Sequence, residues 1–162
     1  MIVGVPKEIK NNEYRVGLTP KSVDEITSIG HDVYVENNAG FEIGYTNQNY
    51  IESGAKIINS AEEVYKSSEL IVKVKEPLSS EFNFINKDNI LFTYLHLAGN
   101  KDESIELAKT GVTGIAYETV TSDDGSLPLL SPMSSIAGQL SIIVGSYNLL
   151  KHNNGKGTLL GN

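Results

Sequence analysis

Short apolar runs alternate with helix-forming segments along most of this chain, and this alternation constrains its fold more than any other feature. The runs with the length and composition of strands are residues 2–5, 32–36, 57–58, 70–74, 90–95 and 112–116. Strands that alternate with helices at this spacing form parallel β-α-β units. The sequence therefore predicts a three-layer α/β fold, Rossmann-like or flavodoxin-like, around a mostly parallel sheet.

The helix predicted after the first strand has clear end signals. Thr19 is a good N-cap residue, Pro20 fits the first helical position, and Gly30 suits the left-handed position beyond the last turn. Apolar residues recur in this segment at helical spacing, at Val23, Ile26 and Ile29. We expect this stripe to face the sheet.

A second, long helix is predicted from about Pro132. We therefore expect two parts, an N-terminal domain at residues 1–130 and, at residues 131–162, a linking helix with the first residues of a further domain. The closing HNNGKGTLLGN reads as a loop and the entrance to a new element. We interpret the chain as cut off there, with a frayed tail as the alternative.

Composition argues against several kinds of function. The 162 residues contain no cysteine, hence no disulfide or thiolate metal ligand, and no histidine–carboxylate cluster has metal-ligand spacing. A net charge of −7 without a basic run argues against a nucleic-acid partner. No apolar run is long enough to span a bilayer, and the N-terminus does not resemble a signal peptide, so we expect a cytoplasmic location.

Motifs for nucleotide binding and nucleophilic catalysis are absent from the sequence. It has no G-x-x-x-x-G-K-[ST] loop, no G-x-S-x-G elbow and no G-x-G-x-x-G after a strand, and GKGTLLG has the wrong glycine spacing. Asp123, Asp124 and Gly125 are typical of a turn rather than a cation loop. His31 and His152 stand beside turn residues, and we interpret both as surface histidines.

Three residues with useful chemistry lie in the segments that follow predicted strands. Arg15 comes after the first strand, Lys75 after LIVKV, and His96 after the apolar part of ILFTYL. If these strands are adjacent and parallel, the three residues emerge at one edge of the sheet, where functional groups gather. Arg15 could clamp a carboxylate, Lys75 could polarise a carbonyl oxygen, and His96 could exchange a proton near neutral pH.

Each of these residues also has a structural alternative. His96 lies in the apolar stretch ILFTYLHLAG and could fill the core with its ring nitrogens satisfied. Arg15 could be a surface arginine. Taken alone, Lys73 and Lys75 are better interpreted as solvated charges at a strand end.

Five blocks of the sequence together resemble the N-terminal part of the alanine dehydrogenase family. They are GVPKEIKNNEYRVGLTP, VKVKEPL, LFTYLHLA, GVTGIAYETV and LPLLSPMSSIAG, in the order and spacing of the family. The related proton-translocating transhydrogenase subunits share the opening block and the K-E-P turn but lack the His-Leu-Ala of LHLA. His96 therefore favours the dehydrogenases.

The resemblance implies reversible, NAD-dependent oxidative deamination of L-alanine to pyruvate and ammonia. It implies that Arg15 and Lys75 bind the substrate and that His96 is the catalytic proton-transfer residue. Ser134 matches a serine that approaches the nicotinamide cofactor. The resemblance also implies a homo-oligomer for the intact enzyme.

Two features depart from the family. Ser135 and Gln139 replace a glutamate and an arginine, so the long helix loses an oppositely charged pair four residues apart. The family's NAD-binding Rossmann domain and a further catalytic aspartate are not among these 162 residues, so we expect the chain alone to be inactive. The alternatives are a non-enzymatic remnant, a small oxo-acid- or amino-acid-binding module, and a transhydrogenase-like fragment.

Overall fold

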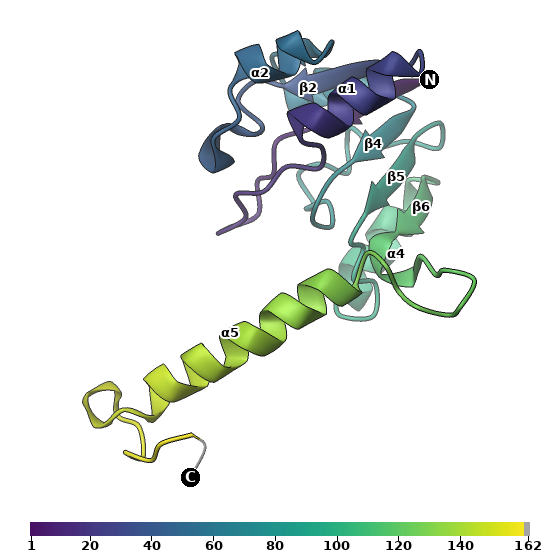
Figure 1. Cartoon of the computed structure of the whole chain (residues 1–162). Helices are drawn as coiled ribbons and strands as arrows, with labels where there is room; N and C mark the ends of the chain where they lie inside the picture. The colour runs from purple at the N-terminus through teal and green to yellow at the C-terminus, as the bar shows by residue number, and fades with distance from the viewer. Residues whose placement is uncertain (161–162) are drawn as a thin grey trace. The chain divides into compact units, whose positions relative to one another are not determined.

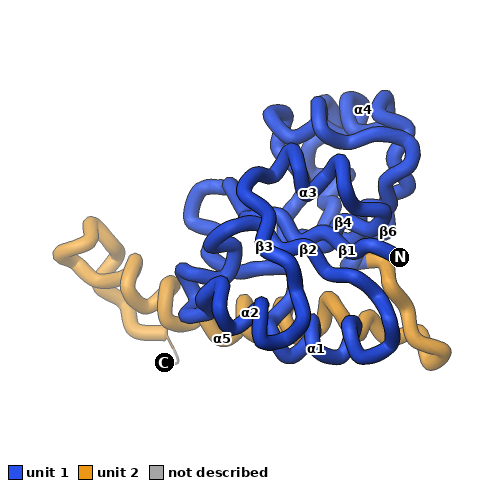
Figure 2. The backbone as a smooth tube through the Cα atoms, turned by 90° about the horizontal axis from the view of Figure 1, so that it is seen from above, with its two compact units in different colours: residues 1–118 blue, residues 119–162 orange. Residues whose placement is uncertain are grey.

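The computed structural model describes residues 1–160 and divides the chain into two compact units. The first unit is Met1–Glu118, drawn in blue in Figure 2, and the second begins at Thr119 and is drawn in orange. Gly161 and Asn162, the end of the segment predicted to enter a further domain, lie outside the described residues. No helix within residues 1–160 combines the length and apolar character that crossing a membrane requires.

The strands of the first unit form one parallel sheet in the order β3-β2-β1-β4-β5-β6 (Figure 1). They are β1 (Ile2–Val5), β2 (Asp32–Glu36), β3 (Lys56–Ile58), β4 (Leu70–Val72), β5 (Ile90–Thr93) and β6 (Thr113–Ala116). This order is that of the Rossmann fold rather than of the flavodoxin-like fold. The prediction of a Rossmann-like α/β domain is confirmed.

Helices cover both faces of this sheet. They are α1 (Pro20–Ser28), α2 (Asn47–Glu52), α3 (Ala61–Ser67) and α4 (Lys101–Lys109), with short 3-10 turns η1 (Phe41–Ile43) and η2 (Tyr117–Thr119). Figure 2 shows α1 and α2 on one face and α3 and α4 on the other. Because successive side chains of a strand point to opposite faces, β4 contributes Val72 to one apolar core and Ile71 to the other.

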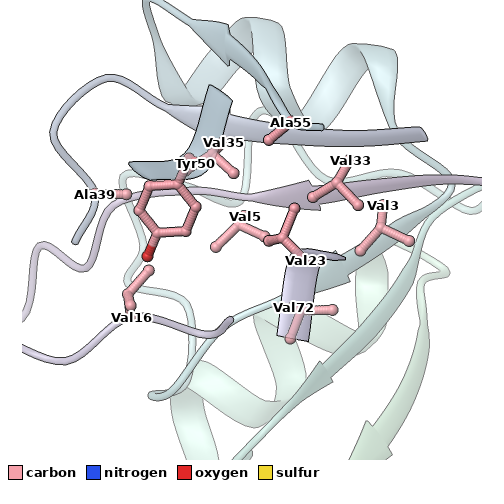
Figure 3. Packing of buried hydrophobic residues seen from close by; sticks show 10 residues of the cluster. All are labelled: Val3, Val5, Val16, Val23, Val33, Val35, Ala39, Tyr50, Ala55 and Val72. Carbon is pink, nitrogen blue, oxygen red and sulfur yellow. The ribbon is translucent and has the colours of Figure 1, made fainter. Parts of the chain in front are cut away.

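The core under α1 and α2 is rich in valine. Val23 of α1 is fully buried against strand residues that include Val5 and Val72 (Figure 3). The predicted end signals of α1 are confirmed, since the Thr19 side chain accepts from Ser22 N–H and Gly30 has φ +89°. Ile29 was expected on the buried stripe but is 71% exposed, because it is the C-cap residue at which the helix ends.

The second core lies between the sheet and the opposite helices. Tyr65 of α3 and Leu107 of α4 pack there against Ile71 and Leu91, which come from the neighbouring strands β4 and β5. Val72, the next residue after Ile71, belongs to the valine-rich core instead. Side chains of β4 are therefore packed on both faces of the sheet. This packing holds in place the end of β4, from which the following segment starts.

The second unit is built around one long helix, α5 (Ser131–Leu149), followed by the 3-10 turn η3 (Lys151–Asn153). Its start agrees with the helix predicted from about Pro132. The 19 residues of α5 include no charged side chain. The predicted Asp-Asp-Gly turn is also present in this unit, since Gly125 has φ +81° and Asp124 Oδ1 accepts from Ser126 N–H at 2.9 Å.

Candidate functional site

The carboxyl ends of β1, β4 and β5 lie side by side in the sheet. β1 pairs with β4 and β4 pairs with β5, all in parallel. The segments that leave these strands carry Arg15, Lys75 and His96, so the condition attached to the sequence prediction is confirmed. The point between β1 and β4 is also where the strand order reverses, which is where open α/β sheets bind ligands.

Arg15 is engaged by a nearby carboxylate in the segment after β1. Its Nε and Nη2 donate to the two oxygens of Glu13 at 2.8 and 2.6 Å. This hydrogen bonding lowers the pKa of the Glu13 carboxyl below its ordinary value and raises the pKa of Arg15. A planar guanidinium can form two parallel hydrogen bonds with a carboxylate, and the pair of Arg15 and Glu13 has this arrangement.

Lys75 is half-buried and is held through its main chain. Its N–H donates to Glu8 Oε1 at 3.2 Å, and its carbonyl accepts from Thr93 Oγ1 at 2.9 Å. Its positive charge helps to lower the pKa values of both Glu13 and Glu76. The ammonium of Lys75 therefore acts on the same carboxylate that binds Arg15, and the two cations share one electrostatic environment.

Glu8 ends the ladder of β4. Its Oε1 accepts from Val74 N–H at 2.6 Å as well as from Lys75 N–H. The strand predicted over residues 70–74 stops at Val72. Lys73 N–H still donates to Phe92 O at 3.1 Å, but the next two amides donate to a side chain from the segment after β1. Burial raises the pKa of Glu8 above its ordinary value, although Lys73 and these amides oppose the rise.

Lys73 is fully buried, so its interpretation as a solvated strand-end charge is wrong. Its ammonium lies 2.9 Å from Glu81 Oε1 and 3.3 Å from Glu8 Oε2. The Tyr65 hydroxyl donates to the same Glu81 oxygen at 2.9 Å, and Leu78 N–H donates to the other at 2.8 Å. A buried lysine stays charged only when it is paired and hydrogen-bonded in this way.

His96 is exposed, which excludes the core-filling alternative. It takes the left-handed conformation, with φ +52°, and its N–H donates to Glu118 Oε1 at 2.7 Å. It borders a cavity of about 220 Å³ together with residues that include Glu76, Leu95 and Asn100. Neither Arg15 nor Lys75 lines this cavity, so the structure places the three residues on neighbouring strand ends without joining them in one pocket.

Ser134 belongs to the second unit. It is exposed in the first turn of α5, and its N–H donates to Leu130 O at 3.1 Å. Among the other sequence candidates, His31 is partly exposed and His152 is exposed. Within residues 1–160, no group of three or more metal-ligating side chains comes together.

The segment that follows β1 does not fit a dinucleotide. In a nucleotide-binding Rossmann domain, a glycine-rich turn at this point cradles the pyrophosphate. Here the segment carries Glu8 and Glu13, whose charges oppose a phosphate, and it passes so close to β4 that a Cβ on Gly17 would lie 2.4 Å from the Val72 carbonyl oxygen.

Sequence reasoning missed the carboxylates that hold this edge together, which are Glu8, Glu13, Glu81 and Glu118. One signal was available. Lys73 interrupts the apolar run LIVKV between two valines, and a lysine in a buried strand requires a carboxylate partner. The identity of that partner was not readable, because Glu8 and Glu81 belong to other segments of the chain.

Comparisons with known proteins show which family the chain resembles. The sequence description of a family named "Alanine dehydrogenase/PNT, N-terminal domain" matches residues 4–137. An alanine dehydrogenase of Methanococcus maripaludis is 52% identical over 99% of the chain, and one of Mycolicibacterium smegmatis is 47% identical over the same share. The chain spans 43% of the length of each of these relatives.

Solved structures give the same picture. A structure titled L-alanine dehydrogenase superposes with a TM-score of 0.87 at 49% identity, covering 100% of this chain and 45% of that one. A transhydrogenase from Sinorhizobium meliloti gives a TM-score of 0.68 at 30% identity, covering 73% of this chain and 35% of that one.

Proposed function

Because the chain belongs to the family of alanine dehydrogenase/PNT N-terminal domains, we propose that it is the substrate-binding and catalytic part of an NAD-dependent L-alanine dehydrogenase. The reaction would convert L-alanine, NAD and water to pyruvate, ammonia and NADH. The observation that carries this proposal is the position of Arg15, Lys75 and His96 at the ends of three adjacent parallel strands. The similarity to alanine dehydrogenases supports the reaction class.

In this proposal Arg15 and Lys75 orient the substrate. Arg15 binds the carboxylate of alanine or pyruvate, and its pair with Glu13 supports this role because it uses the same fork geometry. Lys75 lies next to the reacting carbon and polarises the keto oxygen of pyruvate as a compact positive charge. Its main chain, held by Glu8 and Thr93, would keep that charge in place.

His96 is the proposed proton-transfer residue. An imidazole titrates near neutral pH and can accept or donate a proton as the carbon–nitrogen bond of the substrate is made or broken. The exposure of His96 supports this role, since a group that exchanges protons with a substrate must be reachable. The His-Leu-Ala sequence at this point also favours a dehydrogenase over a transhydrogenase.

NAD enters the proposal for the whole enzyme only. The segment that follows β1 does not fit a pyrophosphate, so we derive no hydride step from it. Ser134 is the one residue of this chain that we propose to contact the cofactor. We further propose that residues 1–130 form the substrate domain and that residues 131–162 contain a linking helix and the first residues of an NAD-binding domain.

The remaining parts of the proposal follow from the chemistry. Hydride transfer requires a cofactor held against the substrate, so we expect these 162 residues alone to show no pyruvate-dependent NADH oxidation. We propose a homo-oligomer for the intact enzyme, no nucleic-acid partner, and a cytoplasmic location where the nicotinamide pool is found. Appreciable turnover by the purified chain would contradict the first of these statements.

Pyruvate titration of the chain tests the substrate site directly. We expect pyruvate binding by calorimetry or NMR to weaken about tenfold or more in Arg15→Lys, because a lysine cannot form the paired hydrogen bonds of a guanidinium. Lys21→Ala, which removes an exposed cation of α1, is the matched control and should leave affinity unchanged. If Arg15→Lys binds pyruvate like the unmodified chain, Arg15 is not the carboxylate ligand.

His96 is tested in the complete enzyme. His96→Ala should reduce turnover far more than it weakens substrate binding, because the proton-transfer role acts on the chemical step. Unchanged turnover would remove His96 from the mechanism. The similarity to a transhydrogenase keeps hydride exchange between two nucleotides as the second candidate, and activity with alanine as against nucleotide exchange alone distinguishes the two.

A further inference from the structure

Glu118 reaches from the end of β6 to the segment that carries His96. Its Oε2 accepts from Leu95 N–H at 3.2 Å, and its Oε1 accepts from His96 N–H at 2.7 Å. Both oxygens of one carboxylate are therefore used on two successive amides. Glu118 lies in η2, 22 residues away in sequence, so this contact is a tertiary one.

The backbone that Glu118 holds is an unusual one. His96 has φ +52°, in the left-handed region that residues other than glycine rarely adopt. A conformation of this kind persists only when its surroundings determine it. The charged hydrogen bond to the His96 amide supplies such a determinant.

The imidazole itself is fixed from the other side. A Cβ on Gly99 would lie 2.8 Å from His96 Cδ2, so the ring rests against the Gly99 main chain, and this contact requires glycine. Gly99 N–H donates to His96 O at 2.9 Å, which closes a tight turn. His96 lines a cavity together with Glu76 and Asn100.

We propose that Glu118 is the positioning residue for His96. By binding the amides of Leu95 and His96, it selects the left-handed backbone that places the imidazole against Gly99 at the cavity. This inference rests on the proposed function for one clause only, that His96 transfers protons to the substrate. The placement of the ring by Glu118 stands on the hydrogen bonds and the backbone geometry alone.

NMR spectroscopy of the chain tests the placement without any substrate. In Glu118→Ala, we expect the nuclear Overhauser contact between the His96 ring and the Gly99 Hα to disappear. The exchange of the Leu95 and His96 amides should accelerate about tenfold or more, because each loses a charged acceptor. Glu118→Gln keeps an acceptor oxygen and should restore the ring contact.

Two further variants separate positioning from charge and from folding. Glu103→Ala removes another carboxylate from the border of the same cavity and should change neither the ring contact nor the amide exchange. Gly99→Ala should displace the ring while the two amides stay protected by Glu118. Persistence of the ring contact in Glu118→Ala, or its loss in Glu103→Ala, would overturn the proposal.

A pyruvate titration distinguishes failure of this inference from failure of the proposed function. In the unmodified chain, pyruvate should shift the His96 ring resonances. In Glu118→Ala and in Gly99→Ala that response should vanish, while the affinity for pyruvate stays within about twofold. If pyruvate leaves the ring unchanged in the unmodified chain, the proton-transfer role of His96 fails, and the substrate-free measurements still decide whether Glu118 positions it. A ring response that survives in Gly99→Ala would show that ring placement has no functional consequence.

Discussion

The ammonium of Lys73 lies 2.9 Å from the carboxylate of Glu81, and both side chains are almost completely shielded from solvent. Glu8 adds a second carboxylate to the same cation at 3.3 Å. One ammonium group therefore pairs with two buried carboxyl groups from different segments. Without Lys73, both carboxyl groups would lie in a poorly solvated space without the cation that pairs with them.

Replacement of Lys73 by methionine should destabilise the fold strongly. Lys73→Met leaves Glu8 and Glu81 buried without their cation, and we expect the free energy of unfolding to fall by roughly 3–5 kcal/mol. Urea denaturation followed by circular dichroism measures this. Lys66→Met is the matched control, since Lys66 forms only an exposed pair with Glu62 and should cost at most about 0.5 kcal/mol. Equal effects in the two variants would contradict the buried-network account.

Glu13 should compete with substrate for Arg15. Glu13→Gln removes the carboxylate that pairs with the guanidinium, so we expect pyruvate to bind about fivefold more tightly, as the loss of one charge-assisted competitor predicts. Isothermal titration of the variant and of the unmodified chain gives the ratio. Glu25→Gln, which alters an exposed pair on α1, should leave the affinity as it was. Weaker binding in Glu13→Gln would mean that Glu13 orients Arg15 rather than competing for it.

Stability should decline at alkaline pH. Burial raises the pKa values of Tyr50, Tyr65 and Tyr117 above the ordinary value of 10.0. The unfolded chain therefore loses these protons first, and the free energy of unfolding falls as pH rises above that value, by about 1.4 kcal/mol per pH unit for each tyrosine. Urea titrations at about pH 9 and at about pH 11 give the free energy of unfolding below and above the ordinary tyrosine pKa.

The variant Tyr50→Phe tests whether Tyr50 contributes to this loss of stability at alkaline pH. The variant loses the hydrogen bond to Leu18 O at 2.9 Å, but it should show a shallower alkaline decline because one buried titrating group is gone. An alkaline decline as steep in Tyr50→Phe as in the unmodified chain would assign the effect to other groups.

Gly17→Ala should be more damaging than an ordinary glycine substitution. The new Cβ would lie 2.4 Å from the Val72 carbonyl oxygen, which belongs to the backbone and cannot rotate away, so we expect a loss of about 2–3 kcal/mol. At Gly30 nothing lies within 4 Å of a Cβ, and only the positive φ opposes alanine, at about 1 kcal/mol. Thermal and urea unfolding of the two variants gives the order. A smaller loss at Gly17 than at Gly30 would disprove the close approach.

The parts of the fold that were predicted from sequence depend on local patterns. The strands at residues 2–5 and 32–36 and the helix that begins at Pro20 carry their signals within a few residues, and all three are confirmed. The prediction that Arg15, Lys75 and His96 follow neighbouring strands required only strand order, which parallel topology restricts. Their roles in a reaction stay predictions.

The features that were missed depend on distant partners. Lys73 was interpreted as solvated because its neighbours in sequence do not include Glu8 or Glu81. Likewise, nothing local to LHLA indicates that Glu118 would bind its backbone or that His96 would adopt a left-handed conformation. Strand lengths were overestimated at β4 for the same reason, since the acceptor that ends its ladder lies 66 residues earlier.

The strand order also determines when each strand can find its partner during synthesis of the chain. β1 is made first but lies inside the sheet, with β2 on one side and β4 on the other. Until Leu70 and Ile71 have been synthesised, the β4-facing edge of β1 has no partner, although β1, β2 and β3 are already complete. An unpaired strand edge of valines is a site for association with other chains. During synthesis, protection of that edge depends on the arrival of β4, and a pause of the ribosome before this point would leave the nascent chain most exposed to aggregation.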